Sequence, residues 1–205
     1  TGLSNGTSYD ARVSAVNAVG TGAASATSLV TPVTTPDAPT VDSVVAGDGQ
    51  VTINFTAPAS DGGSAITDYV VEYKASSDSS WTTFSHDASA SILSYTITGL
   101  TNGTSYDVRV SAVNAVGTSL ASNTSSVTPV TTPDAPTVDS VVAGDGAVTI
   151  NFTAPASDGG SAVTDYLVEY KASSDSSWTT FSHAASASTL SYTITGLSNG
   201  TSYDV

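Results

Sequence analysis

Short runs of alternating hydrophobic and polar residues recur along this chain. In one of them Val51, Ile53 and Phe55 alternate with threonine and asparagine. A period of two residues predicts half-buried β-strands, and no stretch shows the 3.6-residue period of a helix. Turn dipeptides such as Asp48-Gly49 separate the runs. The pattern therefore predicts an all-β protein.

A long internal repeat predicts the domain organisation. Residues 131–151 reproduce residues 34–54 with one change, from Gln50 to Ala147, so the period is 131 less 34, or 97 residues. A fixed period of this kind indicates a tandem array, and function must be read per repeat. We therefore expect three segments, which are the C-terminal part of a repeat (residues 1–33), a complete repeat (34–130) and the N-terminal part of a third (131–205).

Seven β-runs with turn signals between them are expected in the complete repeat, which predicts a two-sheet sandwich. The expected strands are 41–46, 51–56, 68–74, 81–84, a fifth strand near Tyr95, Ile97 and Leu100, and then 106–112 and 121–127. By the same reading, residues 1–33 supply strands six and seven of their repeat. Residues 131–205 supply strands one to five and the start of strand six.

Composition narrows the classes of function. The chain has 18 acidic residues and four basic ones, for a formal net charge of -14. Such a surface repels phosphate backbones, so nucleic acid is not an expected partner. The lack of cysteine excludes disulfides and thiolate metal sites, and no apolar run approaches the roughly 20 residues of a membrane span. Because methionine is also lacking, we expect the sequence to be an internal part of a longer polypeptide.

Several motifs of the repeat resemble those of a known family. They are the Pro-rich entry 36–39, the second strand 51–55, the segment 61–73 (DGGSAITDYVVEY) and the segment 100–106 (LTNGTSY), which continues to Asn114 and Gly117. Together, over the whole chain, they resemble fibronectin type III domains of the bacterial extracellular type. The resemblance implies tandem seven-stranded immunoglobulin-like β-sandwiches.

The resemblance also implies a role for one tyrosine of each repeat. Tyr106, with its equivalents Tyr9 and Tyr203, would be the corner tyrosine, whose hydroxyl ties back to the preceding loop. Phe55 and Phe152 stand where the family usually has tryptophan, which keeps an aromatic residue in the core without an indole donor. The integrin-binding sequence Arg-Gly-Asp is absent, so that function is not carried over.

No constellation of catalytic residues is apparent, and we expect no enzyme activity. His86 and His183 are the only imidazoles, and the aspartate that follows His86 is replaced by Ala184 in the next repeat. A solvated loop histidine is therefore favoured over a catalytic base. Trp81 and Trp178 are either exposed platforms for a sugar ring or, as we favour, covers of a sheet edge.

The acidic loops are the candidate metal ligands. Asp37, Asp42, Asp48 and Asp61 would have to converge, because calcium needs six to eight oxygen ligands around one point. No calcium-loop spacing is present, so solvated turn carboxylates are favoured over calcium at domain junctions. We expect no cofactor, and Gly62-Gly63 has none of the context of a phosphate-binding loop.

Six asparagines lie in Asn-x-Ser/Thr sequons. Because Asn-Gly-Thr is also favourable turn chemistry, the motif does not by itself predict glycosylation. The six are Asn5, Asn54, Asn102, Asn123, Asn151 and Asn199.

The segment 127–136 between repeats contains three prolines and should be extended and semi-rigid. Sandwich domains chained by stiff links form a rod. We therefore predict a non-catalytic structural repeat of an extracellular or cell-surface rod, stalk or filament, whose partners are neighbouring copies of the repeat. The alternative is an adhesive or carbohydrate-binding spacer of a surface adhesin or secreted hydrolase.

The partial repeats at the two ends allow two interpretations. Either the sequence is a window of a longer array, or the N-terminal strands of one chain complete the last domain of the next chain, head to tail. Under both we expect one whole sandwich and two partial ones that other copies complete.

Overall fold

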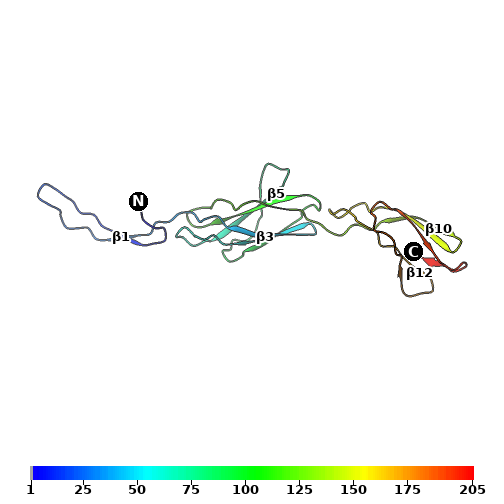
Figure 1. The fold of residues 1–205 in the computed structure, drawn as a ribbon. Helices are drawn as coiled ribbons and strands as arrows, with labels where there is room; N and C mark the ends of the chain where they lie inside the picture. The colour runs from blue at the N-terminus through cyan, green and yellow to red at the C-terminus, as the bar shows by residue number, and fades with distance from the viewer. Residues whose placement is uncertain (1) are drawn as a thin grey trace. The chain divides into compact units, whose positions relative to one another are not determined.

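The computed structural model describes residues 2–205, so Thr1 of the expected segment 1–33 lies outside the described residues. The complete repeat folds as a sandwich of two antiparallel sheets, drawn in cyan to green in Figure 1. One sheet has the order β3-β4-β7 and the other the order β6-β5-β8-β9. The strands are β3 (Thr40–Gly47), β4 (Gln50–Thr56), β5 (Asp68–Ala75), β6 (Thr82–Thr83), β7 (Ser94–Thr98), β8 (Tyr106–Val113) and β9 (Ser125–Val127). The predicted seven-stranded fold is confirmed.

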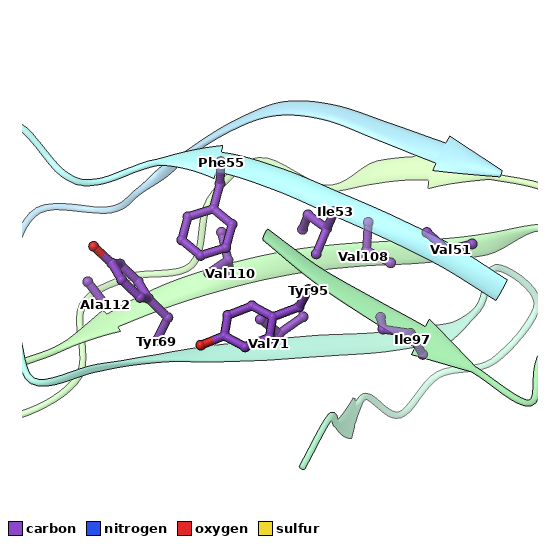
Figure 2. Packing of buried hydrophobic residues seen from close by; sticks show 10 residues of the cluster. All are labelled: Val51, Ile53, Phe55, Tyr69, Val71, Tyr95, Ile97, Val108, Val110 and Ala112. Atoms are coloured by element: carbon purple, nitrogen blue, oxygen red, sulfur yellow. The ribbon is translucent and has the colours of Figure 1, made fainter. Parts of the chain in front are cut away.

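The alternating positions form the core between the two sheets. Figure 2 shows ten buried side chains from β4, β5, β7 and β8 packed together. Phe55 is 2% exposed, and its ring packs edge-on against Tyr69 with the centroids 4.8 Å apart. Burial of each such side chain contributes about 1.5–3 kcal/mol. Phenylalanine thus fills the position where the family usually has tryptophan.

The last strand of the repeat is shorter than predicted. Strand seven was expected over 121–127, but β9 covers Ser125–Val127 only. Upstream, the hydroxyls of Ser119 and Ser122 accept the backbone N–H groups of Ala112 and Val110 at 2.9 and 3.1 Å. Side-chain oxygens therefore replace backbone carbonyls in the ladder, which interrupts regular pairing.

Other strand boundaries differ by small amounts. β6 contains two residues instead of the predicted four, and β7 ends before Gly99, which has a φ of 76°. The register between β3 and β4 shifts between Val41 and Ser43, so Asp42 lies in a β-bulge. A bulge of this kind twists an edge strand and hinders its pairing with another chain.

The N-terminal segment contributes one hairpin. Its strands are β1 (Tyr9–Ala11) and β2 (Ser28–Val30). The predicted sixth strand, 106–112, corresponds to residues 9–15 in this segment, so β1 is shorter than predicted. Val13, Val16 and Leu29 are each more than 70% exposed, because this segment has no second sheet against which to pack. A division into two compact units falls between Pro129 and Val130, and the hairpin belongs to the first unit.

The second unit is also an incomplete sandwich. Its sheets have the orders β10-β11-β14 and β13-β12-β15. Val138 and Val141 are half-exposed, whereas the equivalent Val41 and Val44 of the complete repeat pack against the core. The strands are β10 (Thr137–Gly144), β11 (Ala147–Thr153), β12 (Glu169–Ala172), β13 (Thr179–Thr180), β14 (Ser191–Thr195) and β15 (Tyr203–Asp204). Completion of the partial sandwiches by other copies stays a prediction.

Residues 2–205 include no helix with the length and apolar character that a bilayer crossing requires.

Candidate functional site

The junction between repeats is fixed by backbone hydrogen bonds on both sides. Gly6 N donates to Pro32 O at 2.9 Å, within the preceding segment, and Thr34 N donates to Gly62 O at 2.9 Å, within the complete repeat. Val33 is therefore the only residue between the two bonded groups. A linker of one residue has very little conformational freedom, in contrast to a flexible tether.

The same local bonds recur one period later. Gly103 N donates to Pro129 O at 2.9 Å, and Thr131 N donates to Gly159 O at 2.8 Å. Here Val130 is the single intervening residue. Each hydrogen bond is thus a property of the repeat and not of one position in the chain.

Asn114 holds the loops that surround the junction. Its side chain is buried, and Nδ2 donates to the carbonyl oxygens of Thr34 and Asp61, both at 2.8 Å. Its Oδ1 accepts from the backbone N–H groups of Val116 and Gly117 at 2.9 and 3.1 Å. One amide therefore ties three segments together: the start of the repeat, the loop after β4 and the loop after β8.

Trp81 lies in a patch of charged side chains on the sheet that contains β5 and β8. The guanidinium of Arg109 lies 4.1 Å from the ring centroid, and Lys74 Nζ lies 5.5 Å from it. Arg109 Nε is 2.8 Å from Glu72 Oε2, and Lys74 Nζ is 3.2 Å from Asp107 Oδ2. Because cations occupy the ring face, Trp81 resembles an edge cover more than an open platform for sugar.

Trp178, the equivalent tryptophan, is 50% exposed. Lys171 Nζ lies 5.4 Å from its ring centroid. A lysine therefore lies near the ring of both tryptophans.

The expectation of a solvated loop histidine is wrong for both imidazoles. The His86 side chain is 11% exposed, and its ring lies 4.2 Å from that of Tyr95. Nδ1 lies 3.0 Å from Asp87 O and 4.0 Å from Asp68 Oδ1. Because the Asp87 contact uses the backbone carbonyl, alanine at the equivalent position preserves it, and His183 Nδ1 lies 3.0 Å from Ala184 O.

The carboxylate beside each histidine was not anticipated. Asp68 Oδ1 also accepts the backbone N–H of Ser89 at 3.1 Å. Asp165 occupies the same place near His183, and the hydrogen bond from Ser186 N holds the pKa of Asp165 below its ordinary value. The hydrogen-bond contact of each imidazole is thus to a backbone carbonyl of the next residue, in both repeats.

The four candidate calcium ligands do not converge. Asp42 Oδ2 accepts from Thr56 at 2.8 Å, and Asp48 Oδ1 accepts from Asn102 Nδ2 at 2.8 Å. Asp61 Oδ1 accepts the N–H of Gly63 within its own loop. Over the described residues no three His, Cys, Asp or Glu side chains cluster as a metal site would require. The carboxylates of Asp42, Asp48 and Asp61 thus bind turn and strand partners.

The sequon asparagines divide into two groups. Asn102 Oδ1 accepts from Gly49 N at 2.9 Å, and Asn54 bonds Ser43 and Ser94 across the sheet. Asn151 and Asn199 make the equivalent bonds in the second unit. Asn5 and Asn123 are exposed. Turn and sheet chemistry therefore accounts for four of the six sequons.

The tyrosines at the predicted corner positions make the expected bond. The Tyr106 hydroxyl accepts the backbone N–H of Thr101 at 3.1 Å. The same bond joins Ser4 N to Tyr9 and Ser198 N to Tyr203, at 2.9 and 3.1 Å. The family model described as "Fibronectin type III domain" matches residues 35–128 and 132–205.

The chain belongs to the fibronectin type III family. The tandem arrangement of these domains agrees with the sequence resemblance, whereas the bacterial type finds no support among the relatives, which are animal proteins. Neural cell adhesion molecule 1 of Gallus gallus is 34% identical over 149 residues, which are 70% of this chain and 14% of that protein. M-protein of striated muscle, also from Gallus gallus, is 31% identical over 193 residues, or 87% of this chain and 13% of that protein.

Solved structures give matches of the same kind. The chain in a crystal structure of titin domains is 33% identical to this chain in sequence. The match covers 50% of this chain and 36% of the titin chain, with a TM-score of 0.44. The chain thus spans about one seventh of the curated relatives named above.

Two features of the fibronectin type III repeat were missed by sequence reasoning. Asn114 was noted only as part of a motif, although the equivalent Asn17 bonds Val19 N and Gly20 N in the same way. Asp87, which follows His86 in the sequence, was considered as the carboxylate partner of that histidine, whereas Asp68 was not. The available signal was recurrence, because Asp68 and His86 both recur one period later and Asp87 does not.

Proposed function

We propose that this chain is a non-catalytic structural module of an extracellular or cell-surface rod, stalk or filament. The observation that carries the proposal is the junction, where the single residue Val33 separates a hydrogen bond of one repeat from a hydrogen bond of the next. Neighbouring copies of the repeat are the proposed partners. A stiff junction transmits length and force along an array, whereas a binding module needs no such constraint between domains.

The sequence of the array supports the same proposal. Two successive repeats differ at only six of the 75 positions they share. The function of the repeat therefore depends more on the number of copies than on sequence differences between their loops. The relatives include proteins named for muscle and for cell adhesion. The proposal rests on the repeat and its junction, and it holds for a cell-surface array in any organism.

Electron microscopy of the native full-length protein tests this proposal. We expect straight particles with an axial repeat of roughly 35–40 Å, the span of a seven-stranded sandwich with its short linker. Particles that bend freely between globular beads would contradict a structural rod. A single rigid head on a flexible tether would indicate a spacer instead.

An adhesive or carbohydrate-binding spacer is the second candidate. The observation that favours it is the similarity to neural cell adhesion molecule 1. Binding of the chain to an array of immobilised glycans, with Trp178→Ala as the variant and Trp81→Ala as its matched control, tests this function. Binding that is lost in the Trp178 variant alone would establish it, and absence of binding to every glycan would remove the sugar ligand.

A further inference from the structure

The turn of one repeat meets a loop of the next repeat at two glycines. Gly6 lies in the Asn5-Gly6 turn of the N-terminal segment, and Gly63 lies in the loop between β4 and β5. A Cβ on Gly63 would lie 2.6 Å from Gly6 Cα and closer still to Gly6 N. A Cβ on Gly6 would lie 3.1 Å from Gly63 Cα. The two backbones therefore touch without a side chain between them.

Both sides of this contact are anchored by hydrogen bonds. Gly6 N donates to Pro32 O at 2.9 Å, which fixes the turn to the end of its own segment. Gly63 N donates to Asp61 Oδ1 at 2.8 Å, and Asn114 Nδ2 donates to Asp61 O at 2.8 Å. The loop is thus fixed to the complete repeat, and neither side can retreat without breaking these bonds.

The neighbouring Gly62 makes room for the start of its own repeat. A Cβ on Gly62 would lie 2.6 Å from Thr35 O and closer still to Thr34 O. The two successive glycines therefore have different neighbours, the start of their own repeat for Gly62 and the preceding turn for Gly63. The bond from Thr34 N to Gly62 O fixes the start of the repeat to this loop, so the loop contacts both sides of Val33.

We infer that Gly63 is a docking surface between successive repeats, whose partner is the Asn-Gly turn of the preceding repeat. The inference rests on the proposed rod function and names the contact that would set its stiffness. In a link of one residue, only the two backbone dihedrals of Val33 remain to be fixed. A second contact away from the link removes that freedom and fixes the orientation of one repeat on the next. The sequence repeats both partners one period later, as Gly103 and Gly160.

A distance measurement across the junction tests the inference. Since the chain has no cysteine, Asp10→Cys and Ser80→Cys introduce two spin labels at exposed positions, one in each repeat. Double electron–electron resonance on the full chain should give one narrow distance distribution. Because carbon atoms pack about 3.5–4.0 Å apart, Gly63→Ala must displace the turn by about 1 Å, and the distribution should shift or broaden.

Gly99→Ala is the matched control. Gly99 has a φ of 76° and Gly63 a φ of 82°, so both variants carry similar backbone strain, but a Cβ on Gly99 meets no atom within 4 Å. Gly6→Ala disturbs the contact from the other side and leaves the complete repeat intact, which keeps the test valid if Gly63→Ala fails to fold. Its distribution should also shift or broaden.

Two results would overturn the inference in distinguishable ways. If the unsubstituted chain gives a narrow distribution and the Gly63 and Gly6 variants both match Gly99→Ala, the docking surface is wrong and the rod proposal stands. If the unsubstituted chain already gives a broad distribution, the junction is flexible, and the rod proposal fails together with the inference.

Discussion

Two tyrosines of the complete repeat differ in whether the hydroxyl makes a hydrogen bond. The Tyr95 side chain is buried in the core (Figure 2). Within residues 2–205 its hydroxyl has no hydrogen-bond partner, as is also true of the Tyr192 hydroxyl. Burial, with smaller contributions from Asp68 and Tyr69, raises the pKa of Tyr95, so the phenol stays neutral at physiological pH. The Tyr106 hydroxyl, in contrast, accepts the N–H of Thr101. An identical substitution should therefore have opposite effects at the two positions.

Tyr95→Phe is expected to raise the free energy of unfolding by about 1 kcal/mol, because it removes a buried polar atom that has no partner. Tyr106→Phe, the matched control, is expected to lower it by about 0.5–1.5 kcal/mol, because it leaves Thr101 N without its acceptor. Urea denaturation of the two variants measures both values. Equal losses in the two variants would mean that the Tyr95 hydroxyl is satisfied in solution.

At the scale of the strands, charged side chains join neighbouring elements. Asp107 on β8 accepts from Ser126 on β9 at 2.7 Å and from Ser76 after β5 at 2.8 Å. These two hydrogen bonds, with Lys74 alongside, hold the pKa of Asp107 below its ordinary value. Arg109 on the same strand lies over Trp81 beside β6. Side chains of β8 thus connect both neighbours of that strand.

The lowered pKa of Asp107 predicts a loss of stability in acid. A carboxyl whose folded pKa lies below its unfolded value contributes stability above the unfolded pKa, about 3.9, and loses it as the pH falls through the folded pKa. We expect the free energy of unfolding to fall in that range and to fall less in Asp107→Asn. Urea denaturation at a series of pH values measures the slope. Ser126→Ala, which removes the largest cause of the shift, should give an intermediate slope, and an unchanged slope in both variants would exclude Asp107 as a source.

Arg109→Ala should expose the ring of Trp81. The guanidinium occupies the ring face at 4.1 Å, and a contact of this kind contributes about 0.5–1 kcal/mol at exposed sites. In a Trp178→Phe background, acrylamide should quench the remaining fluorescence more strongly after the substitution. Arg12→Ala changes the equivalent arginine of the N-terminal segment and serves as the control. Equal quenching in the two variants would show that Arg109 does not cover the ring.

At the scale of the whole molecule, negative charge dominates the electrostatics. A net charge of -14 on 205 residues produces self-repulsion that salt screens, with a Debye length of about 10 Å at 0.1 M. Since three of the four candidate acidic ligands bind turn and strand partners and the four do not converge over the described residues, screening rather than specific cation binding should govern the response to ions. Stability should therefore follow ionic strength and not the identity of the cation.

We accordingly expect sodium chloride to raise the midpoint of thermal unfolding by a few degrees, and calcium chloride at equal ionic strength to raise it by the same amount. Differential scanning calorimetry measures both midpoints. A saturable increase at low calcium concentration, absent with sodium, would contradict this expectation and indicate a site with convergent oxygen ligands.

The predictability of the chain from its sequence differed between apolar and polar positions. Val51, Ile53 and Phe55 were placed in the core correctly, because alternation in a strand fixes which side chains share a face. His86 was placed wrongly in solvent, since its burial depends on contact with Tyr95 of β7 and therefore on the path of the loop between the two residues. Asn114 was overlooked for the same reason, because its partners lie 53 and 80 residues away in sequence.

The sequence by itself determined the all-β class and the period of 97 residues, because these depend on local alternation, turn chemistry and self-similarity. Its resemblance to the fibronectin type III family implied the corner tyrosine, and the family model agrees. Only the tertiary structure decided that Arg109 covers Trp81, that the Tyr95 hydroxyl lacks a partner and that Gly6 touches Gly63. Each of these features depends on residues that are far apart in the chain, and its geometry exists only once two sheets and their loops have packed together.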